Sequence, residues 1–587
     1  MGQRLRRFSR PLPVLLVVTA LALLARLVAL GARVAHQDEG RVADWILHYM
    51  TVGQWQYRPI IHGPFLPHVN GVVFSWLGAT DATMRLVVAV GGGLLPLCAY
   101  LYRDRLRDDE VVIFGLLLAA SPALLYYSRF MRNDLLVAAC MMAALGCWSR
   151  AAATRRIRYV LAGTLPFALA FTMKENALLY PVAWIGAGVL VLDRHLLAAA
   201  LSERGLVASV TDAVGEWRRS AETRTAAAFL LALPAALLVF AAVVVAFYAP
   251  IPEVYGLFGG PGAFAGVVET ATVDTWHAFV GTWAHAGMSS HSTVEFVGRL
   301  LKIVGLTATV TCAFALVGFV RERYGRGGTR NVVEFCFYWG TASIFGYAVV
   351  TDILAGWLAT HVVAPLALPA AVGLAWVHRV GKRGYVAGEP IAFRLAAAVL
   401  LVSAAVVGGT AAYTSYAAPQ DGETNPLVQY AQPAGEMKPT LAEIETVAAA
   451  HDGIDVVFYG EEFYNPSDLE RPPSLEIESG GYPGWFARLP LPWYFDRYGA
   501  RVGSTTDRSV LADRQPPVVI ALESEAGAVR SALDADAYTE RTHQGYQSGR
   551  PLVFFVRDDA TEGATTDAAS ADAAGAMPAP NGSVVAA

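Results

Sequence analysis

The feature that most constrains this chain is a series of long apolar runs between Leu12 and Tyr413. Most of these runs are about 17–25 residues long, which is the length that a helix needs to cross the hydrocarbon core of a bilayer. The chain is 55% hydrophobic and only 16% charged, too few charges to cover a water-facing surface. The sequence therefore predicts a mainly α-helical membrane bundle of about eleven spans. The predicted spans are 12–32, 84–102, 111–127, 134–149, 158–173, 177–192, 227–249, 298–320, 331–350, 354–377 and 391–413.

Basic residues gather at alternate ends of these predicted spans. The basic segments hold Arg4, Arg6, Arg7 and Arg10, then Arg103, Arg105 and Arg107, Arg150, Arg155, Arg156 and Arg158, the loop 193–226, Arg321, Arg323, Arg326 and Arg330, and finally Arg379, Lys382 and Arg383. Cytoplasmic loops carry an excess of Lys and Arg. The pattern therefore predicts a multi-pass cell-membrane protein with a cytoplasmic N-terminus. The loops 33–83, 128–133, 174–176, 250–297 and 351–353, and everything after 413, then face the exterior.

The chain divides by composition into a membrane domain, an outer domain and a tail. Residues 1–415 hold the spans, with a long first outer loop at about 33–83. In 416–557, apolar bursts at 456–459, 518–522 and 553–556 alternate with helix-like stretches at 440–450 and 524–535, which predicts a soluble α/β domain with a mostly parallel sheet. The tail, 558–587, is acidic, lacks aromatic residues and is rich in Ala, Asp, Thr and Gly, so we expect it to be disordered.

Several charged residues lie at the predicted outer ends of apolar segments, where charge costs free energy and invites a functional explanation. They are Asp38 and Glu39 after the first span, Arg129, Arg132 and Asp134 in YYSRFMRND, Lys174 and Glu175 in FTMKENA, and His361 within a later span. Carboxylates facing Arg and Lys near a membrane suit one reaction well. A phosphate leaving group needs cations, an attacking hydroxyl needs a carboxylate to take its proton, and a polyprenyl tail needs a lipid-exposed groove.

Particular motifs then resemble a known superfamily. The Asp38-Glu39 pair, the His62-Gly63-Pro64-Phe65 turn and the segment from Phe74 to Leu86, which contains Arg85, are similar to the polytopic GT-C glycosyltransferases. These include protein O-mannosyltransferases and aminoarabinose transferases. More narrowly, HQDEG, YYSRFMRND, FTMKENA and WLATHVVAPLAL resemble the archaeal flippase-associated membrane family of N-glycosylation, over residues 10–415.

The resemblance implies a function and roles for residues. It implies transfer of a sugar from a polyprenyl- or dolichyl-phosphate donor to an acceptor glycan or protein at the outer membrane face, with no nucleic-acid partner. Asp38 would be the base or would orient the acceptor, with Glu39 beside it, and three cations would meet the lipid phosphate: Arg129, Arg132 and Lys174. The supporting residues would be His36, His62, Arg85, Asp134, Glu175 and His361. The chain lacks a metal-binding DxD, and we expect neither a metal nor another cofactor. It also lacks a WWD-type acceptor signature, which argues against recognition of a peptide sequon.

Other interpretations of the same residues stay open. Asp38 and Glu39 could cap an interfacial helix, Arg129 and Arg132 could anchor headgroups, and Lys174 and Glu175 could form internal ion pairs. The histidines His36, His62 and His361 could bind zinc with Asp38. The whole protein could be a non-enzymatic partner that helps a lipid-linked glycan to cross the bilayer, or presents it. A transporter is a more distant alternative, because no related halves are visible in the sequence.

Overall fold

The computed structural model describes residues 11–200, 223–284, 292–325, 330–351, 353–429, 431–433, 435–466, 484–545 and 550–560. The chain forms two compact units. The first consists of Met1–Arg33 and His48–Gln429, and the second consists of Val34–Leu47 and Tyr430–Ala587. Most of the predicted disordered tail, from residue 561 onward, lies outside the described residues.

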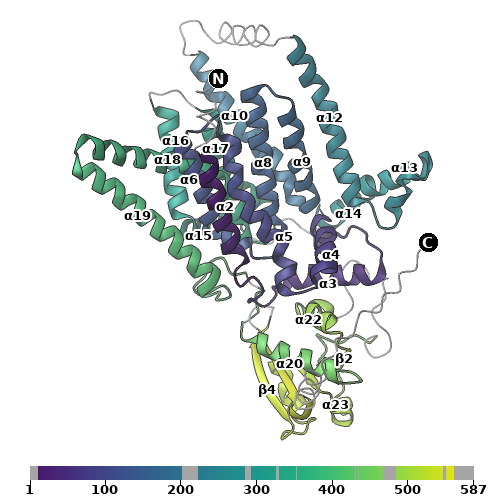
Figure 1. The fold of residues 1–587 in the computed structure, drawn as a ribbon. Coiled ribbons are helices and arrows are strands. Elements are labelled where there is room, and N and C mark those ends of the chain that lie inside the picture. The colour runs from purple at the N-terminus through teal and green to yellow at the C-terminus, as the bar shows by residue number, and fades with distance from the viewer. Residues whose placement is uncertain are drawn as a thin grey trace, which may run out of the picture. The chain divides into compact units, whose positions relative to one another are not determined.

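The first unit is a membrane-type helical bundle (Figure 1). Within the described residues, six helical segments are long and apolar enough to cross a bilayer, and each corresponds to a predicted span. They are Asp81–Tyr102, Asn133–Thr154, Glu175–Leu197, Asn331–Val349, Gly356–Ala387 and Pro390–Ala417. Three shorter apolar helices correspond to further predicted spans: α2 (Pro11–Leu27), α9 (Arg158–Met173) and the described part of α12, Ala232–Tyr248. The full count of eleven spans is therefore not confirmed.

Two predicted spans are not single straight helices. The span 111–127 is divided into α6 (Asp108–Ala120) and α7 (Pro122–Tyr127), because Pro122 has no N–H to continue the helix and favours an extended residue before it. The span 298–320 consists of α15 (Thr293–Thr307) and α16 (Thr309–Tyr324), bent by 96°. At this bend the threonine hydroxyls on both sides donate to backbone carbonyls one turn earlier, which competes with the helical ladder.

Helix α18 (Ala359–Ala387) forms the centre of the first unit. Its first two thirds are buried almost throughout, and it contacts α16, α17 (Asn331–Val350), α19 (Pro390–Ala412), α6 and α8 (Asn133–Thr154). The approach to α16 is so close that a Cβ on Gly318 would lie 1.9 Å from the Pro369 carbonyl oxygen. This packing fixes the first turn of α18, which carries His361, inside the unit.

Three further helices belong to the part of the first unit that contains α8. Helix α9 packs along α8, and α5 (Asp81–Leu94) contacts both α8 and α2. Helix α10 (Leu179–Ala200) contacts α17 and follows α9 through the short turn η3 (Glu175–Leu178). The outer-side loops 128–133 and 174–176 predicted from the sequence are thus the connections that start α8 and end α9.

The second unit contains a five-stranded sheet in the order β2-β1-β3-β5-β4. Its strands are β1 (Val456–Tyr459), β2 (Val502–Thr505), β3 (Val518–Leu522), β4 (Tyr538–Gln544) and β5 (Pro551–Arg557). The pairings of β1 with β2 and β3 are parallel, whereas β5 pairs antiparallel with β3 and β4. The expectation of a mostly parallel sheet is therefore wrong: the sheet is mixed, because the connection 545–550 between β4 and β5 is too short for the crossover that parallel strands need.

Of the two helix-like stretches predicted in the second unit, one forms a helix of the expected length and the other forms only short helices. Helix α20 (Met437–Ala450) corresponds to the predicted stretch 440–450, and α23 (Arg508–Arg514) connects β2 to β3. The predicted stretch 524–535 contains only the short η9 (Glu523–Glu525) and α24 (Ala526–Arg530). Val457, Val519 and Phe555 from three adjacent strands form part of the core that packs against α23 and α24.

A segment of the first outer loop is part of the second unit. Residues 37–47 begin helix α3 (Gln37–Val52), and they pack on α21 (Trp485–Arg488) and α22 (Leu491–Tyr498). The Ala35 N–H donates to the Tyr494 hydroxyl at 2.8 Å, and a Cβ on Gly40 would lie 2.5 Å from the Pro490 Cβ. The second unit is thus assembled from two distant parts of the chain.

A pair of carboxyl groups lies within this packing. The Trp485 indole donates to Asp44 Oδ2 at 2.9 Å, while Asp44 Oδ1 has no donor among the described residues. Burial and the neighbouring Asp496 raise the pKa of Asp44 well above its usual value, and burial raises the pKa of Asp496. Folding therefore favours the protonated form of Asp44 over its charged form.

Replacing Asp44 with Asn should therefore stabilise the second unit at neutral and alkaline pH. A pKa raised by folding gives a stabilisation that is complete below the usual carboxyl value of about 4 and is lost as the pH rises through the raised pKa. Asn supplies a permanent N–H donor, so we expect this pH-dependent loss of stability to disappear. The free energy of unfolding of the second unit should then rise by about 1–3 kcal/mol at pH 8. Hydrogen exchange of peptides from α21 and α22 between pH 5 and 8, corrected for intrinsic rates, measures this effect. Asp513→Asn at an exposed position is the control, and identical pH profiles for Asp44→Asn and wild type would contradict the assignment.

Candidate functional site

A buried network around Asp134 forms the centre of the candidate site. Asp134 lies in the first turn of α8, where the helix dipole favours a negative charge. The Lys174 ammonium donates to both of its carboxylate oxygens at 2.9 Å, and the Asn176 amide donates to Oδ1 at 3.2 Å. His361 Nε2 lies 3.1 Å from the same oxygen. Three segments that are far apart in the sequence, the starts of α8 and α18 and the end of α9, therefore meet at one carboxylate.

The orientation of His361 is fixed from its other side. Its Nδ1 lies 2.6 Å from the Tyr180 hydroxyl, and the Tyr347 ring stacks on the imidazole with centroids 4.7 Å apart. With Nδ1 accepting from Tyr180, Nε2 carries the proton and donates it to Asp134. This tautomer satisfies both hydrogen bonds with a neutral imidazole.

Two cations lie at the Asp134 carboxylate. Arg132, only 5% exposed, has its Nε 3.5 Å from Asp134 Oδ2, and its guanidinium lies 3.5 Å from the centre of the Trp357 ring. The Lys174 ammonium lies 5.6 Å from the same ring. Two cations therefore lie beside one carboxylate and one indole ring, an arrangement suited to an anionic ligand.

The residue next to Lys174 forms a second network. Glu175 accepts from the Tyr57 hydroxyl at 2.7 Å, and it pairs with His62 Nδ1 at 3.1 Å. Burial and the Glu175 carboxylate raise the pKa of Tyr57, so its hydroxyl stays a donor. The His62-Gly63-Pro64 turn is seated directly on the end of α9, where a Cβ on Gly63 would lie 2.3 Å from a backbone oxygen. His62 and Glu175, both singled out from the sequence, are therefore brought together.

Asp38 and Glu39 lie in the second unit, in the first turn of α3. The Glu39 carboxylate is fully buried and accepts from the His36 backbone N–H at 2.9 Å, as a helix-capping group does. Asp38 pairs with Arg41 at 3.1 Å, and its backbone N–H donates to His36 Nδ1 at 3.0 Å. The Asp38 side chain keeps 14% of its surface exposed. Of the two carboxylates, Asp38 is therefore the one with surface left for an external group.

The remaining two arginines serve the backbone of the first unit. The Arg129 guanidinium donates to four carbonyls at and just beyond the end of α2, at 2.7–3.2 Å. Arg85 is fully buried and donates to the Leu30 and Arg33 carbonyls, both at 3.0 Å. Both side chains thus hold the chain that leaves α2, and the structure does not place Arg129 in the Asp134 network.

Comparisons with known proteins place this geometry in context. Residues 61–212 match a family model described as dolichyl-phosphate-mannose-protein mannosyltransferase, and residues 437–558 match one described as the Agl23 flippase-associated protein C-terminal domain. These two regions are therefore similar to a mannosyltransferase family and to an Agl23-type C-terminal domain, and the resemblance seen in the sequence is confirmed. Residues 61–212 contain every candidate residue of the first unit except His361.

One solved structure, ArnT in the apo state, shares the fold, and two others give lower scores. ArnT from Cupriavidus metallidurans in the apo state aligns with a TM-score of 0.54 at 16% identity, over 93% of this chain and 98% of that chain. ArnT bound to undecaprenyl phosphate aligns with a TM-score of 0.48 at 18% identity, over 93% and 98%. The apo Archaeoglobus fulgidus oligosaccharyltransferase gives 0.46 at 14% identity, over 92% and 74%. A search of curated proteins finds no match.

Several residues of the Asp134 and Glu175 networks were not selected from the sequence. Asn176, Tyr180 and Tyr57 are direct partners of the networks, and Trp357 forms the aromatic face under both cations. Asn176 and Trp357 stand beside selected residues, in FTMKENA and WLATHVVAPLAL, so proximity to those motifs was an available signal. Tyr180 lies one helical turn after Asn176, on the face that continues the site.

The histidines considered as metal ligands are separated by their partners. His62 pairs with Glu175, His361 with Asp134, and His36 with the start of α3. Across the described parts of both units, no group of three or more His, Cys, Asp or Glu side chains is arranged to hold a metal ion. The described residues therefore give no support to the binding of zinc by these histidines with Asp38.

Proposed function

We propose that this chain transfers a sugar from a polyprenyl- or dolichyl-phosphate donor to an acceptor glycan or protein at the outer face of the cell membrane. The observation that carries the proposal is the pair of cations at Asp134, where Arg132 and Lys174 both contact the carboxylate and lie near the Trp357 ring. The match of residues 61–212 to a dolichyl-phosphate-dependent mannosyltransferase model, which contains both cations, supports it.

The proposed mechanism assigns one task to each group. Asp38 takes the proton of the acceptor hydroxyl as its oxygen forms a bond to the anomeric carbon of the sugar. The bond from that carbon to the phosphate oxygen breaks, and the electron pair leaves with the polyprenyl phosphate. Arg132 and Lys174 stabilise the negative charge that develops on this leaving group. Glu39 and His36 hold Asp38 in its turn of α3, while Asp134, His361 and Glu175 hold the cations in place.

A second candidate function is supported by a different part of the chain. Residues 437–558 match the C-terminal domain of a protein described as flippase-associated, and Lys174 is already fully paired with Asp134. A chain of this kind could bind lipid phosphate through Arg132 and present the glycan without transferring it. Both candidates require phosphate binding, and only the first requires turnover.

Replacing Arg132 with Ala should weaken binding of a polyprenyl phosphate about 10–100-fold. A hydrogen bond to a charged group is worth about 1.5–3 kcal/mol, and Arg132 is the cation less satisfied by Asp134. Binding of radiolabelled polyprenyl phosphate to purified protein measures the change. Arg103→Ala is the matched control, because Arg103 also lies over an aromatic ring, that of Tyr100, and is outside the network. Equal affinity of Arg132→Ala and wild type would remove the phosphate assignment.

The experiment that tests the function is sugar transfer by the purified wild-type protein in liposomes. Radiolabelled polyprenyl-phosphate sugars serve as donors, and extracted glycolipids and glycoproteins serve as acceptors, with and without a chelator. Transfer of label to an acceptor supports the enzyme. Binding of the donor without transfer to any acceptor supports the presenting partner, and activity lost on chelation would show a metal requirement.

A further inference from the structure

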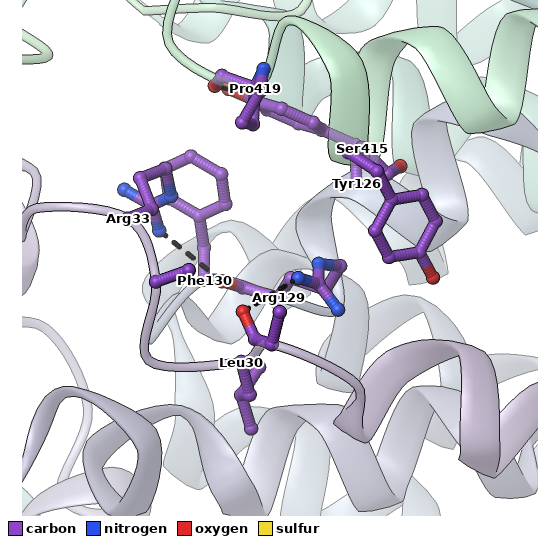
Figure 2. Close-up of a pocket in the computed structure, with 10 residues that line it drawn as sticks. Leu30, Arg33, Tyr126, Arg129, Phe130, Ser415 and Pro419 are labelled. Atoms are coloured by element: carbon purple, nitrogen blue, oxygen red, sulfur yellow. Dashed lines mark hydrogen bonds between the residues drawn. The ribbon is translucent and has the colours of Figure 1, made fainter. Parts of the chain in front are cut away.

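A polar cavity, separate from the Asp134 and Glu175 networks, lies in the first unit beyond the end of α2. It has a volume of about 140 Å³, and its apolar wall includes Leu30, Phe130 and Pro419. Its polar wall comes from three separate segments: Arg33 after α2, Arg129 after α7, and Ser415 in η8 (Tyr413–Ala417) (Figure 2). None of these polar residues belongs to the Asp134 network or to the Glu175 network.

Arg129 brings a positive charge that no acidic partner neutralises. Its interactions are with four backbone carbonyls, and its guanidinium lies 4.7 Å from the centre of the Tyr416 ring. Among the described residues, no carboxylate pairs with it. These neutral partners fix the guanidinium rigidly while leaving its charge in place, and Arg129 is only 9% exposed. A buried, immobile cation on a cavity wall favours an anion inside the cavity.

Ser415 adds an unused hydrogen-bond donor to the same wall. Ser415 is 2% exposed, and its hydroxyl has no hydrogen-bond partner among the described residues. Leaving a buried hydroxyl without a partner costs free energy, and such groups in native structures usually meet a ligand or a water. The Arg33 guanidinium completes the polar wall, where it donates to the Arg129 carbonyl at 3.2 Å and stacks on Phe130.

We propose that this cavity binds a phosphate group, at a site separate from Asp134. Guanidinium N–H groups and a serine hydroxyl are donors that suit phosphate oxygens. A water molecule occupies about 30 Å³ in the liquid, so the volume suits a tetrahedral oxyanion with the first carbons of an ester. The apolar wall of Leu30, Phe130 and Pro419 is suited to those carbons. The site does not depend on the proposed sugar transfer, since it shares no residue with the Asp134 network.

The test uses the full-length protein in dodecyl maltoside, which carries no phosphate. Equilibrium dialysis with ³²P-labelled inorganic phosphate and ³²P-labelled geranyl phosphate measures affinity and the number of sites. Ala32 lines the cavity and is exposed, so Ala32→Glu places a competing carboxylate at its rim, and Ala32→Gln is the neutral control of equal size. Ser415→Ala removes the unused donor and leaves the capping contacts of Arg129 intact.

We expect Ala32→Glu to abolish one binding site per chain, and Ser415→Ala to weaken that site about tenfold, whereas Ala32→Gln stays within about threefold of wild type. Binding of both probes would identify a phosphate-anion site, and binding of geranyl phosphate alone would identify a lipid-phosphate site. A binding site that is lost in Arg132→Ala and kept in Ala32→Glu is the phosphate site of the proposed function. The cavity assignment and the Arg132 assignment can therefore fail independently. Wild-type affinity and site number in both Ala32→Glu and Ser415→Ala would overturn the cavity proposal.

Discussion

Asp38→Asn should lower the rate of sugar transfer at least about 100-fold while leaving donor affinity within about threefold of wild type. A positioned general base contributes about 10²–10⁴-fold, and Asn has the shape of Asp without the ability to take a proton. Asp38 keeps 14% of its side chain exposed, whereas Glu39 is fully buried and caps α3. The measurement is the initial rate of label transfer in liposomes at saturating donor, alongside donor binding to the same preparation.

Two control variants separate chemistry from helix stability at this position. Arg41→Gln breaks the ion pair with Asp38 while keeping the carboxylate, so transfer should stay within a few-fold of wild type. Glu39→Gln keeps an oxygen that can accept from the His36 N–H, and it tests whether the neighbouring charge matters. Wild-type turnover by Asp38→Asn would show that this carboxylate is not the base.

The second large effect concerns the pair at the centre of the first unit. Replacing Lys174 with Met should destabilise the folded protein by about 3–5 kcal/mol, because it removes the closest cation and leaves the buried Asp134 carboxylate with only the longer 3.5 Å ion pair to Arg132. Asp134→Asn should do the same by leaving Arg132 and Lys174 without their shared carboxylate. In the double variant, Asp134→Asn with Lys174→Met, most of this loss should be recovered. The free energy of unfolding in mild detergent, measured for the two single variants and the double variant, gives the coupling directly.

An exposed ion pair provides the contrast for this cycle. Glu295 and Arg299 lie one turn apart on α15 and are each more than half exposed, so their removal should change stability by less than about 0.5 kcal/mol. A double variant in which the losses of Lys174→Met and Asp134→Asn simply add would mean that the pair does not act as a unit. The arrangement around His361 would then need another explanation.

The membrane helices could be predicted where one local property decides the structure. Hydropathy alone located six long apolar segments, and Arg-rich loops delimited them. Hydropathy does not report a break, so the interruption at Pro122 and the 96° bend between α15 and α16 were missed. The sheet shows the same limit: apolar bursts identified β1, β3 and β5, but the direction of a strand depends on its connections, which composition does not encode.

The candidate site was predictable as a set of residues and not as a set of contacts. Asp134, Lys174 and His361 were selected because charge at the end of an apolar helix is costly, and they do meet. Their partners could not be assigned, because Asp134 and His361 are 227 residues apart in the chain. Arg129 was grouped with Arg132 because both stand in YYSRFMRND at the end of an apolar segment and the resemblance implied the same role for both. The helix break beside them directs Arg129 to the end of α2 and Arg132 to Trp357.

The two-part composition of the second unit has a consequence for biosynthesis. Val34–Leu47 leaves the ribosome first, and all of His48–Gln429 is made before the rest of the unit appears. At about 5–20 residues per second this takes roughly 20–80 s. Throughout that interval Asp44 and Trp45 lack their contacts with Trp485, because Trp485 has not yet been synthesised. The membrane spans between residues 48 and 429 enter the membrane during the same interval. A fragment that begins at residue 430 would therefore be made without the segment Val34–Leu47, which packs on α21 and α22 in the complete chain.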